Sequence, residues 1–256
     1  MQNLFSIRGK IALITGGSRG IGLMIARGYV ENGAKVYVSS RKAAACEAVA
    51  AELSEHGECV ALPADLSQMA EVERVAKVLA ERETRLDILV NNAGATWGST
   101  IDEFPENGWD KVMDLNLKSI FFLTQKLLPL LGASASAQDP ARVINIGSVD
   151  GMRFSLFDNF SYSASKAALH QLTKMTATHL ATRNITVNAI APGPFTTPMM
   201  APMIEKMGER IRGSIPLGRL GEPEDVAGLA IFLAARASAY MTGTVIPLDG
   251  GIMGSS

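Results

Sequence analysis

The sequence predicts an α/β protein in which helices cover both faces of a doubly wound parallel β-sheet, within one domain spanning residues 1–256. Short apolar runs of strand length alternate along the chain with stretches of helical periodicity. Hydrophobic residues make up 47% of the chain, enough for a sizeable core. No internal repeat or Ser/Pro-rich linker divides it. Strands that are apolar throughout are typical of a parallel sheet buried on both faces.

The predicted elements follow in a regular order. Strands are expected at 11–14, 35–39, 59–62, 88–90, 143–146, 186–190 and 245–247. A helix follows the first strand and ends near Gly33, and an Ala-rich helix is expected at 43–53. The low-complexity segment 132–140 is expected to be a surface loop. Right-handed crossovers between such strands give a doubly wound sheet.

Composition argues against several classes of protein. The net charge is −1 and the charges are scattered, so neither a nucleic-acid groove nor a membrane-binding face is expected. No apolar run reaches the ~18–20 residues of a membrane helix, and the N-terminus lacks the apolar core of a signal peptide. Cys46 and Cys59 lack the spacing of a metal or redox site and are expected to be free thiols. His56, His170 and His179 also lack ligand spacing, so no metal site is predicted, and a soluble cytoplasmic protein is expected.

A Gly-rich turn follows the first predicted strand. Gly16, Gly20 and Gly22 have the spacing Gly-x-x-x-Gly-x-Gly, which differs from the commoner Gly-x-Gly-x-x-Gly fingerprint. A strand that turns into a helix presents backbone N–H groups and the positive end of the helix dipole to an anion. A plain tight turn is the alternative. The position after the first strand favours a dinucleotide pyrophosphate, and with it a Rossmann fold.

The end of the second predicted strand indicates which dinucleotide binds. NAD sites usually place a carboxylate there for the ribose 2′-hydroxyl. This chain has Ser39, Ser40 and Arg41 instead, and Arg19 lies in the Gly-rich turn. Two guanidinium groups can hold a 2′-phosphate through charge-assisted hydrogen bonds, although both arginines could simply be solvated. The sequence therefore predicts NADP(H) as cofactor.

A candidate catalytic set lies in the second half of the chain. Tyr162 and Lys166 are four residues apart, so on a helix they share one face, and a cation near the phenol lowers its pKa toward a useful range. Ser148 follows an apolar run and is expected at the carboxyl end of a strand, where ligands bind in open sheets. Asn116 falls in an apolar helical stretch, where an amide has either a site role or a structural one that kinks the helix.

Together these segments resemble the short-chain dehydrogenase/reductase (SDR) family over nearly the whole chain. The matching motifs are Thr15-Gly16-xxx-Gly20-x-Gly22, Asp65 in Ala-Asp-Leu, Asn91-Asn-Ala-Gly94, Asn116, Ser148, Tyr162-xxx-Lys166, Asn188-Ala-Ile-Ala-Pro192-Gly193 and Asp249-Gly-Gly251. Six or more ordered motifs at the family's usual separations are not expected by chance.

The resemblance implies a role for each catalytic residue. Tyr162 would be the general acid that protonates the carbonyl oxygen as hydride arrives from the nicotinamide. Lys166 would lower the tyrosine pKa and bind the nicotinamide ribose. Ser148 would orient the carbonyl, and Asn116 would hold a water of the proton relay. The family also implies a homotetramer.

The resemblance further implies a set of cofactor contacts. Asp65 would contact adenine, and Asn91 and Gly94 would line the cofactor floor. The expected contacts, in chain order, are Gly16, Ser18, Arg19, Gly20, Ile21, Ser40, Arg41, Asp65, Leu66, Asn92, Ala93, Gly94, Tyr162, Lys166, Pro192, Gly193, Phe195 and Thr197.

Within the family the chain is most similar to the 3-oxoacyl-thioester reductases, and more narrowly to the rhamnolipid-pathway 3-oxoacyl reductases. Segments 5–9, 134–148 and 239–243 carry this similarity. It implies an NADPH-dependent carbonyl reductase of fatty acid metabolism. The chain departs from many relatives at Asp150, where they have a small residue, and a carboxylate there bears on substrate preference. Two alternatives stay open: reduction of another ketone (cyclic, polyketide-like or sugar), and a non-catalytic NADP(H)-binding regulatory protein.

The segment 196–216 is expected to be a mobile substrate lid, as in the family. Met199, Met203 and Met207 fall on one helical stripe, with Met200 beside it, and thioether side chains suit an adaptable apolar surface. An ordinary amphipathic helix packed on the core is the alternative. The basic residues of the segment could meet coenzyme A phosphates or an acyl carrier protein, or form a solvated helix face. These residues are Lys206, Arg210 and Arg212.

Overall fold

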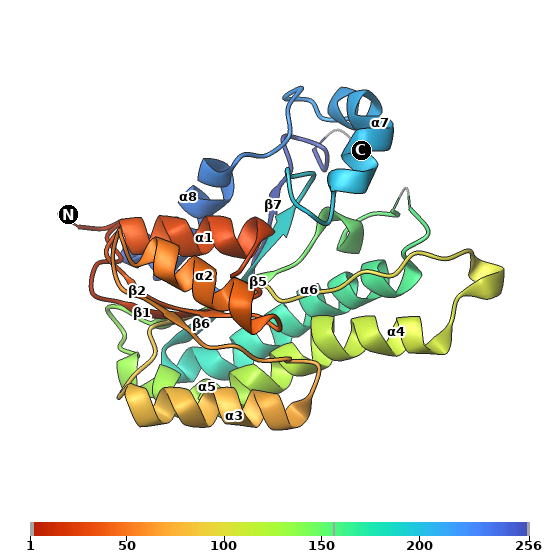
Figure 1. The fold of residues 1–256 in the computed structure, drawn as a ribbon. Helices are drawn as coiled ribbons and strands as arrows, with labels where there is room; N and C mark the ends of the chain where they lie inside the picture. The colour runs from red at the N-terminus through yellow and green to blue at the C-terminus, as the bar shows by residue number, and fades with distance from the viewer. Residues whose placement is uncertain (1–2, 156, 255–256) are drawn as a thin grey trace.

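The computed structural model describes residues 3–155 and 157–254, which form one parallel sheet of seven strands. The strand order is β3-β2-β1-β4-β5-β6-β7 (Figure 1). The strands are β1 (Ile11–Thr15), β2 (Lys35–Ser39), β3 (Cys59–Ala61), β4 (Ile88–Asn91), β5 (Ala141–Ile146), β6 (Ile185–Pro192) and β7 (Val245–Leu248). The sequence predicts all seven within a few residues of these bounds, and the α/β fold class is confirmed.

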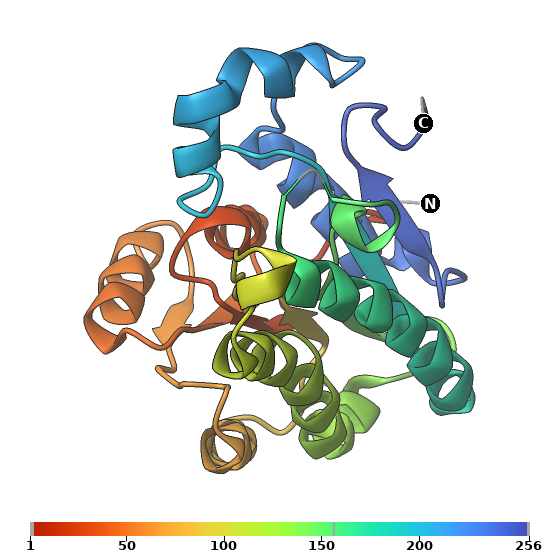
Figure 2. The same ribbon diagram turned by 90° about the vertical axis from the view of Figure 1, so that its right-hand side faces the viewer.

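Helices cover both faces of the sheet (Figures 1 and 2). One face packs against α1 (Gly20–Glu31), α2 (Ala43–Leu53) and α8 (Pro223–Ala234). The other face packs against α3 (Met69–Arg82), α5 (Ser119–Ser134) and α6 (Phe160–Leu180). Two more helices lie toward the carboxyl edge of the sheet: α4 (Glu106–Met113) and α7 (Ala201–Gly213). No helix of the described residues is long and apolar enough to cross a membrane.

Alternate residues of each strand enter different cores. Ala12 and Ile14 of β1 pack with α1, α2 and α8, whereas Leu13 packs with α3 and α5. Both sets are buried, which is why the strands read as continuous apolar runs. Cys46 and Cys59 are buried and free, as the sequence predicts.

The order of the strands changes direction beside β1. The chain runs outward from β1 to β2 and β3, and then returns to place β4 on the other side of β1. In open parallel sheets such a switch leaves a crevice beyond the carboxyl ends of the two central strands, where ligands bind. Here those ends carry Thr15 and Asn91, with Ser39 at the end of β2.

Two local expectations are wrong. Helix α5 continues to Ser134, so the start of the expected loop at 132–140 is helical. The methionines do not form one stripe: Met199 precedes α7 and is exposed, and Met207 has non-helical backbone angles where the helix kinks. Met200, Met203 and Met207 instead pack on a small core of their own. That core consists of Ile211, Ile215, Leu220 and Ile252.

Candidate active site

Three of the candidate catalytic residues come from two elements at the carboxyl edge of the sheet. Ser148 follows β5 and begins the 3-10 turn Val149–Gly151, while Tyr162 and Lys166 lie in the first two turns of α6. The turn packs directly on α6, since a Cβ on Gly151 would lie 2.6 Å from the carbonyl carbon of Lys166. This close approach places the Ser148 hydroxyl within hydrogen-bond reach of the Tyr162 phenol.

The Tyr162 phenol is held in its protonated form. Burial raises its pKa to about 12, the negative charge of Asp150 adds to the rise, and hydrogen bonding with Ser148 acts in the opposite direction. The sequence predicts a lowered pKa instead, because it places the Lys166 ammonium beside the phenol. A protonated phenol at neutral pH is a proton donor.

The Lys166 side chain explains that difference. Its Nζ donates a hydrogen bond of 2.7 Å to the carbonyl oxygen of Ile146 at the end of β5, and lies 5.6 Å from the centroid of the Tyr162 ring. Lys166 is 4% exposed, and burial lowers its pKa to about 8. The ammonium thus bridges the end of β5 and α6 below the tyrosine.

Asn116 lies in a five-residue π-helical turn, Asp114–Lys118, between α4 and α5. It is fully buried, and all its polar atoms have partners. Oδ1 accepts from the N–H of Ala95 at 2.8 Å, and Nδ2 donates to the Ala95 carbonyl and to Oγ of Ser165, both at 3.0 Å. The side chain therefore ties the loop after β4 to α6, and any water that Asn116 holds would have to contact its main chain.

The Gly-rich turn adopts backbone angles that favour glycine. Gly16 has φ 66° and Gly20 has φ 55°, both in the left-handed region. Gly22 lies in the first turn of α1 with no room for a side chain, because a Cβ would lie 2.9 Å from the carbonyl carbon of Gly16. Ser18 and Ile21, between these glycines, are half-buried. The turn leaves the amino end of α1 open toward the crevice, as an anion site requires.

Two cationic side chains lie at the ends of β1 and β2. Arg19 precedes α1 and Arg41 follows β2; both are exposed, and neither has a hydrogen-bond or ion-pair partner among the described residues. The Gly17 N–H donates to the Ser39 carbonyl at 3.2 Å, which joins the two turns. The Ser39 hydroxyl is fully buried without a partner, and Ser40 beside it is half-buried.

The loop after β4 closes the floor of the crevice. Asn92 Nδ2 donates to the carbonyls of Thr15 and Gly16 at 2.9 and 3.2 Å, and the N–H groups of Asn92 and Ala93 donate to the Thr15 hydroxyl. Gly94 adjoins Asn116, whose Oδ1 lies 3.3 Å from the place of a Cβ. The Asn91 side chain points away from the crevice and bonds to Thr124 and Asn145 in the core.

The remaining predicted contacts border the crevice on two sides. Asp65 accepts from the N–H and the hydroxyl of Ser67, and the Leu66 side chain is buried in the core, which leaves only its backbone for a ligand. After β6, Thr197 lies 3.5 Å from the place of a Cβ on Gly20, so this segment crosses the Gly-rich turn. Three other predicted contacts lie between the end of β6 and Thr197. Pro192 ends β6, Gly193 packs against Asp249, and Phe195 is buried against Gly221.

Comparisons with known proteins agree with this arrangement. A family model described as enoyl-(acyl carrier protein) reductase matches residues 16–253. A Pseudomonas aeruginosa protein, the rhamnolipids biosynthesis 3-oxoacyl-(acyl-carrier-protein) reductase, is 53% identical over 253 residues, which make up 98% of this chain and 99% of that protein. The chain belongs to the short-chain dehydrogenase/reductase family.

A solved structure and one further relative extend the comparison. The solved structure of the Pseudomonas aeruginosa RhlG/NADP active-site complex has a TM-score of 0.95 and 53% identity, and the match covers 98% of this chain and 99% of that one. The 2-dehydro-3-deoxy-D-gluconate 5-dehydrogenase of Bacillus subtilis is 36% identical over 253 residues, with 98% and 97% covered.

The structure adds site residues that sequence reasoning missed in this SDR chain. Thr15 and Ser165 hold the predicted residues through the hydrogen bonds above. His170, 6% exposed, lies one turn beyond Lys166 against Gly147, and its buried Nε2 has no hydrogen-bond partner among the described residues. The four-residue spacing of Lys166 and His170 was the available signal, and it indicated only helix packing.

Proposed function

We propose that the protein is an NADPH-dependent carbonyl reductase that acts on 3-oxoacyl thioesters carried by an acyl carrier protein. The observation that carries this proposal is the protonated Tyr162 phenol within reach of the Ser148 hydroxyl, beside a buried lysine. Reduction of a ketone consumes one proton at the carbonyl oxygen, and a phenol that lies beside a hydroxyl and a buried ammonium can donate that proton at neutral pH. The 53% identity to the Pseudomonas aeruginosa reductase supports this substrate class.

The residues at the ends of β1 and β2 fit NADP(H). The Arg19 and Arg41 side chains are exposed cations without a partner among the described residues, so a 2′-phosphate would give both a counter-charge. The open amino end of α1 would hold the pyrophosphate. The solved RhlG structure is a complex with NADP, which supports the same choice. When bound, NADPH supplies the hydride.

The protein's own residues would do the rest. Ser148 and Tyr162 would donate hydrogen bonds to the ketone oxygen and orient it, and Tyr162 would pass its proton to that oxygen as negative charge develops there. Lys166 would stabilise the resulting phenolate electrostatically and contact the nicotinamide ribose. Asn116 would fix the spacing between the loop after β4 and α6, with its main chain toward the proton relay.

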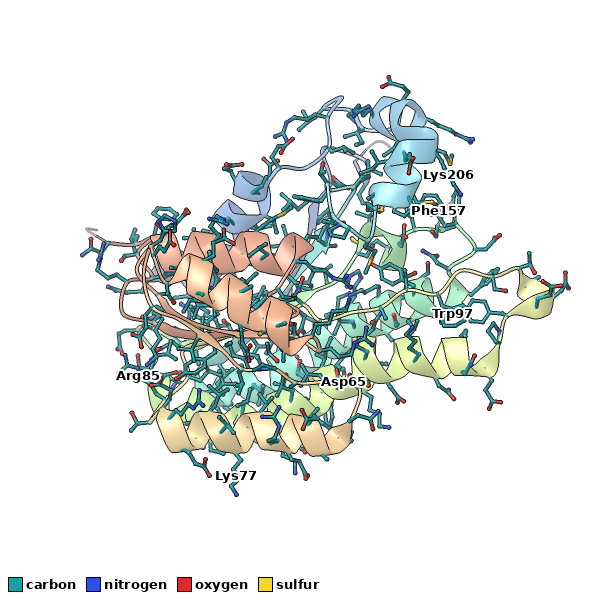
Figure 3. The ribbon with its side chains drawn as sticks, viewed as in Figure 1. Asp65, Lys77, Arg85, Trp97, Phe157 and Lys206 are labelled. Carbon is teal, nitrogen blue, oxygen red and sulfur yellow. The ribbon has the colours of Figure 1, made fainter. Side chains whose placement is uncertain are left out.

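We also propose that 196–216 acts as a lid over the substrate. Its helix α7 rests on a small core separate from the two cores of the sheet, so it can move without opening them. Figure 3 shows Lys206 on α7, on the same side of the molecule as Trp97, whereas Arg85 lies at the opposite end of the sheet. Lys206, with Arg210 and Arg212, would face an acidic carrier.

The assembly and location are further proposals. Family similarity supports a homotetramer, which light scattering tests: a monomer would contradict it. The two free cysteines suit a reducing compartment, and we propose the cytoplasm.

The test is NADPH oxidation by the purified protein with 3-oxoacyl thioesters of increasing chain length. NADH, the Tyr162→Phe protein and a keto-sugar acid serve as controls, the last because a gluconate-type dehydrogenase is 36% identical. Turnover with NADPH on the thioesters supports the proposal. Turnover only on the keto-sugar acid would indicate that the substrates are sugar-derived ketones and not acyl thioesters. Tight NADPH binding without turnover on any ketone would favour a regulatory protein.

A further inference from the structure

Asp150 connects the two hydroxyl-bearing elements of the site. Its backbone N–H donates to Ser148 Oγ at 3.1 Å. Its carboxylate Oδ2 accepts from Ser155 Oγ and from Asn159 Nδ2, both at 3.2 Å. Asn159 immediately precedes α6, and its Oδ1 accepts from Ser163 Oγ at 2.9 Å. Asp150 therefore links Ser148, through hydrogen bonds, to the first turn of α6, which carries Tyr162.

The residues beyond Asp150 connect the 3-10 turn to α6, and we refer to the exposed apolar part of this segment, residues 152–154, as the wall. Met152 and Phe154 are 39% and 81% exposed, although both are apolar. The hydrogen bonds of Asp150 hold both Ser155 and Asn159 in place. They therefore determine the position of the wall relative to Ser148 and Tyr162.

Other charged groups near α6 are directed elsewhere. The elements packed on α6 carry Glu106, Asp110 and Lys111 in α4, Asp114 and Lys118 in the π-helical turn, and Arg183 after the helix. Lys111 lies over the Trp97 ring, and Asp114 pairs with Lys118. Within α6, Lys166 is directed to the Ile146 carbonyl and His170 packs against Gly147, while Lys174 and His179 lie two or more turns beyond Lys166. Two charged groups of the described residues therefore bear on the Tyr162 phenol: Lys166 Nζ lies 5.6 Å from the ring centroid, and the negative charge of Asp150 raises the phenol pKa.

We propose that Asp150 is a positioning residue with two effects: its carboxylate clasps Ser155 and Asn159 to shape the substrate wall, and its negative charge lies next to Ser148, whose hydroxyl accepts from the Asp150 N–H and reaches the Tyr162 phenol. The second effect rests on the proposed function, because a protonated phenol is needed when the enzyme reduces a ketone and donates a proton to its oxygen. The first effect does not depend on which ketone is reduced.

Asp150→Asn tests the charge while it keeps an acceptor oxygen for the clasp. We expect the alkaline limb of the kcat pH profile for NADPH-dependent reduction to move down by about one pH unit, because a like charge no longer opposes ionisation of the phenol. Asp158→Asn is the matched control: it removes the same charge from an exposed residue of the same segment, and its limb stays at the wild-type position. Coincident wild-type and Asp150→Asn profiles would overturn the charge effect.

Asp150→Ala tests the clasp with a readout that needs no substrate. Limited chymotrypsin digestion of the folded protein is expected to cleave near Met152 and Phe154 at least about fivefold faster than in wild type, since each of the two hydrogen bonds lost represents about that factor. Asp150→Asn and Asp158→Asn should be cleaved at the wild-type rate. Cleavage of Asp150→Ala at that rate would overturn the clasp. Wild-type protein that is inactive on 3-oxoacyl thioesters would refute the proposed function and leave the digestion result standing.

Discussion

Substituting alanine for Gly22 would test how tightly the Gly-rich turn is joined to the loop after β4. The added Cβ would lie 2.9 Å from the carbonyl carbon of Gly16 and still closer to that carbonyl oxygen and to Asn92 Nδ2, whereas ordinary contacts begin at 3.4 Å. Neither neighbour can retreat freely. Asn92 Nδ2 is hydrogen-bonded to the carbonyls of Thr15 and Gly16, and Gly16 is in the left-handed region with φ 66°.

The expected cost follows from these contacts. Overpacking of this kind costs about 1–3 kcal/mol. Breaking one of the Asn92 hydrogen bonds to make room costs about 1 kcal/mol more. Alanine in place of glycine stabilises a helix by up to about 1 kcal/mol. The gain in the free energy of unfolding is smaller in the first turn, where Gly22 lies. The free energy of unfolding should therefore fall by about 2 kcal/mol. Because the same turn would cradle the pyrophosphate, NADPH affinity should fall about tenfold or more.

Urea unfolding and fluorescence titration with NADPH measure these two effects. Gly228→Ala is the control: it makes the same substitution in α8, where a Cβ meets nothing within 4 Å, and should raise stability by up to about 1 kcal/mol. If Gly22→Ala proved as stable as Gly228→Ala and bound NADPH like wild type, the close approach in the turn would be refuted.

Four other predictions concern separate parts of the molecule. Tyr162→Phe should lower kcat by about 10²–10⁴ without loss of NADPH binding, and normal turnover would refute its role as the acid. Arg41→Asp should lose most of the preference for NADPH over NADH, measured as the ratio of kcat/KM values, because a charge-assisted bond to the 2′-phosphate becomes a repulsion. Asp139→Asn removes the carboxylate 3.2 Å from the buried Arg142 guanidinium and should cost about 1–3 kcal/mol in urea unfolding; the value is below that of a fully buried pair because Asp139 is 36% exposed. Burial lowers the His170 pKa to about 4 from 6.5, so the unfolded chain binds a proton that the folded state excludes; stability should fall as pH drops from 6.5 toward 4, and His170→Gln should flatten that dependence.

The sequence is informative where a local pattern has one structural meaning. The apolar runs at 11–14 and 35–39 predict β1 and β2 because a strand buried on both faces needs apolar residues without a break. The spacing of Gly16 and Gly20 predicts the turn because only glycine adopts its left-handed angles without strain. The absence of a carboxylate after β2 is likewise visible in the sequence, and it is the basis of the NADP(H) prediction.

Sequence patterns were less informative where the outcome depends on distant contacts. The stripe from Met199 to Met207 fails because the helix begins at Ala201 and kinks at Met207, where the side chains reach a core formed with Ile252, far along the chain. Helical periodicity assumes a regular helix and cannot register a kink that tertiary packing imposes.

The sequence by itself determined the fold class, the order of strands and helices along the chain, and the residues that meet at the carboxyl edge of the sheet. Only the tertiary structure decided how those residues act on one another. The four-residue spacing brings Tyr162 and Lys166 to one face, but the ammonium donates to the Ile146 carbonyl, twenty residues earlier, and the phenol pKa is raised rather than lowered. The physical reason is that spacing along a helix is a local property, whereas desolvation and hydrogen bonding depend on every element packed around the group.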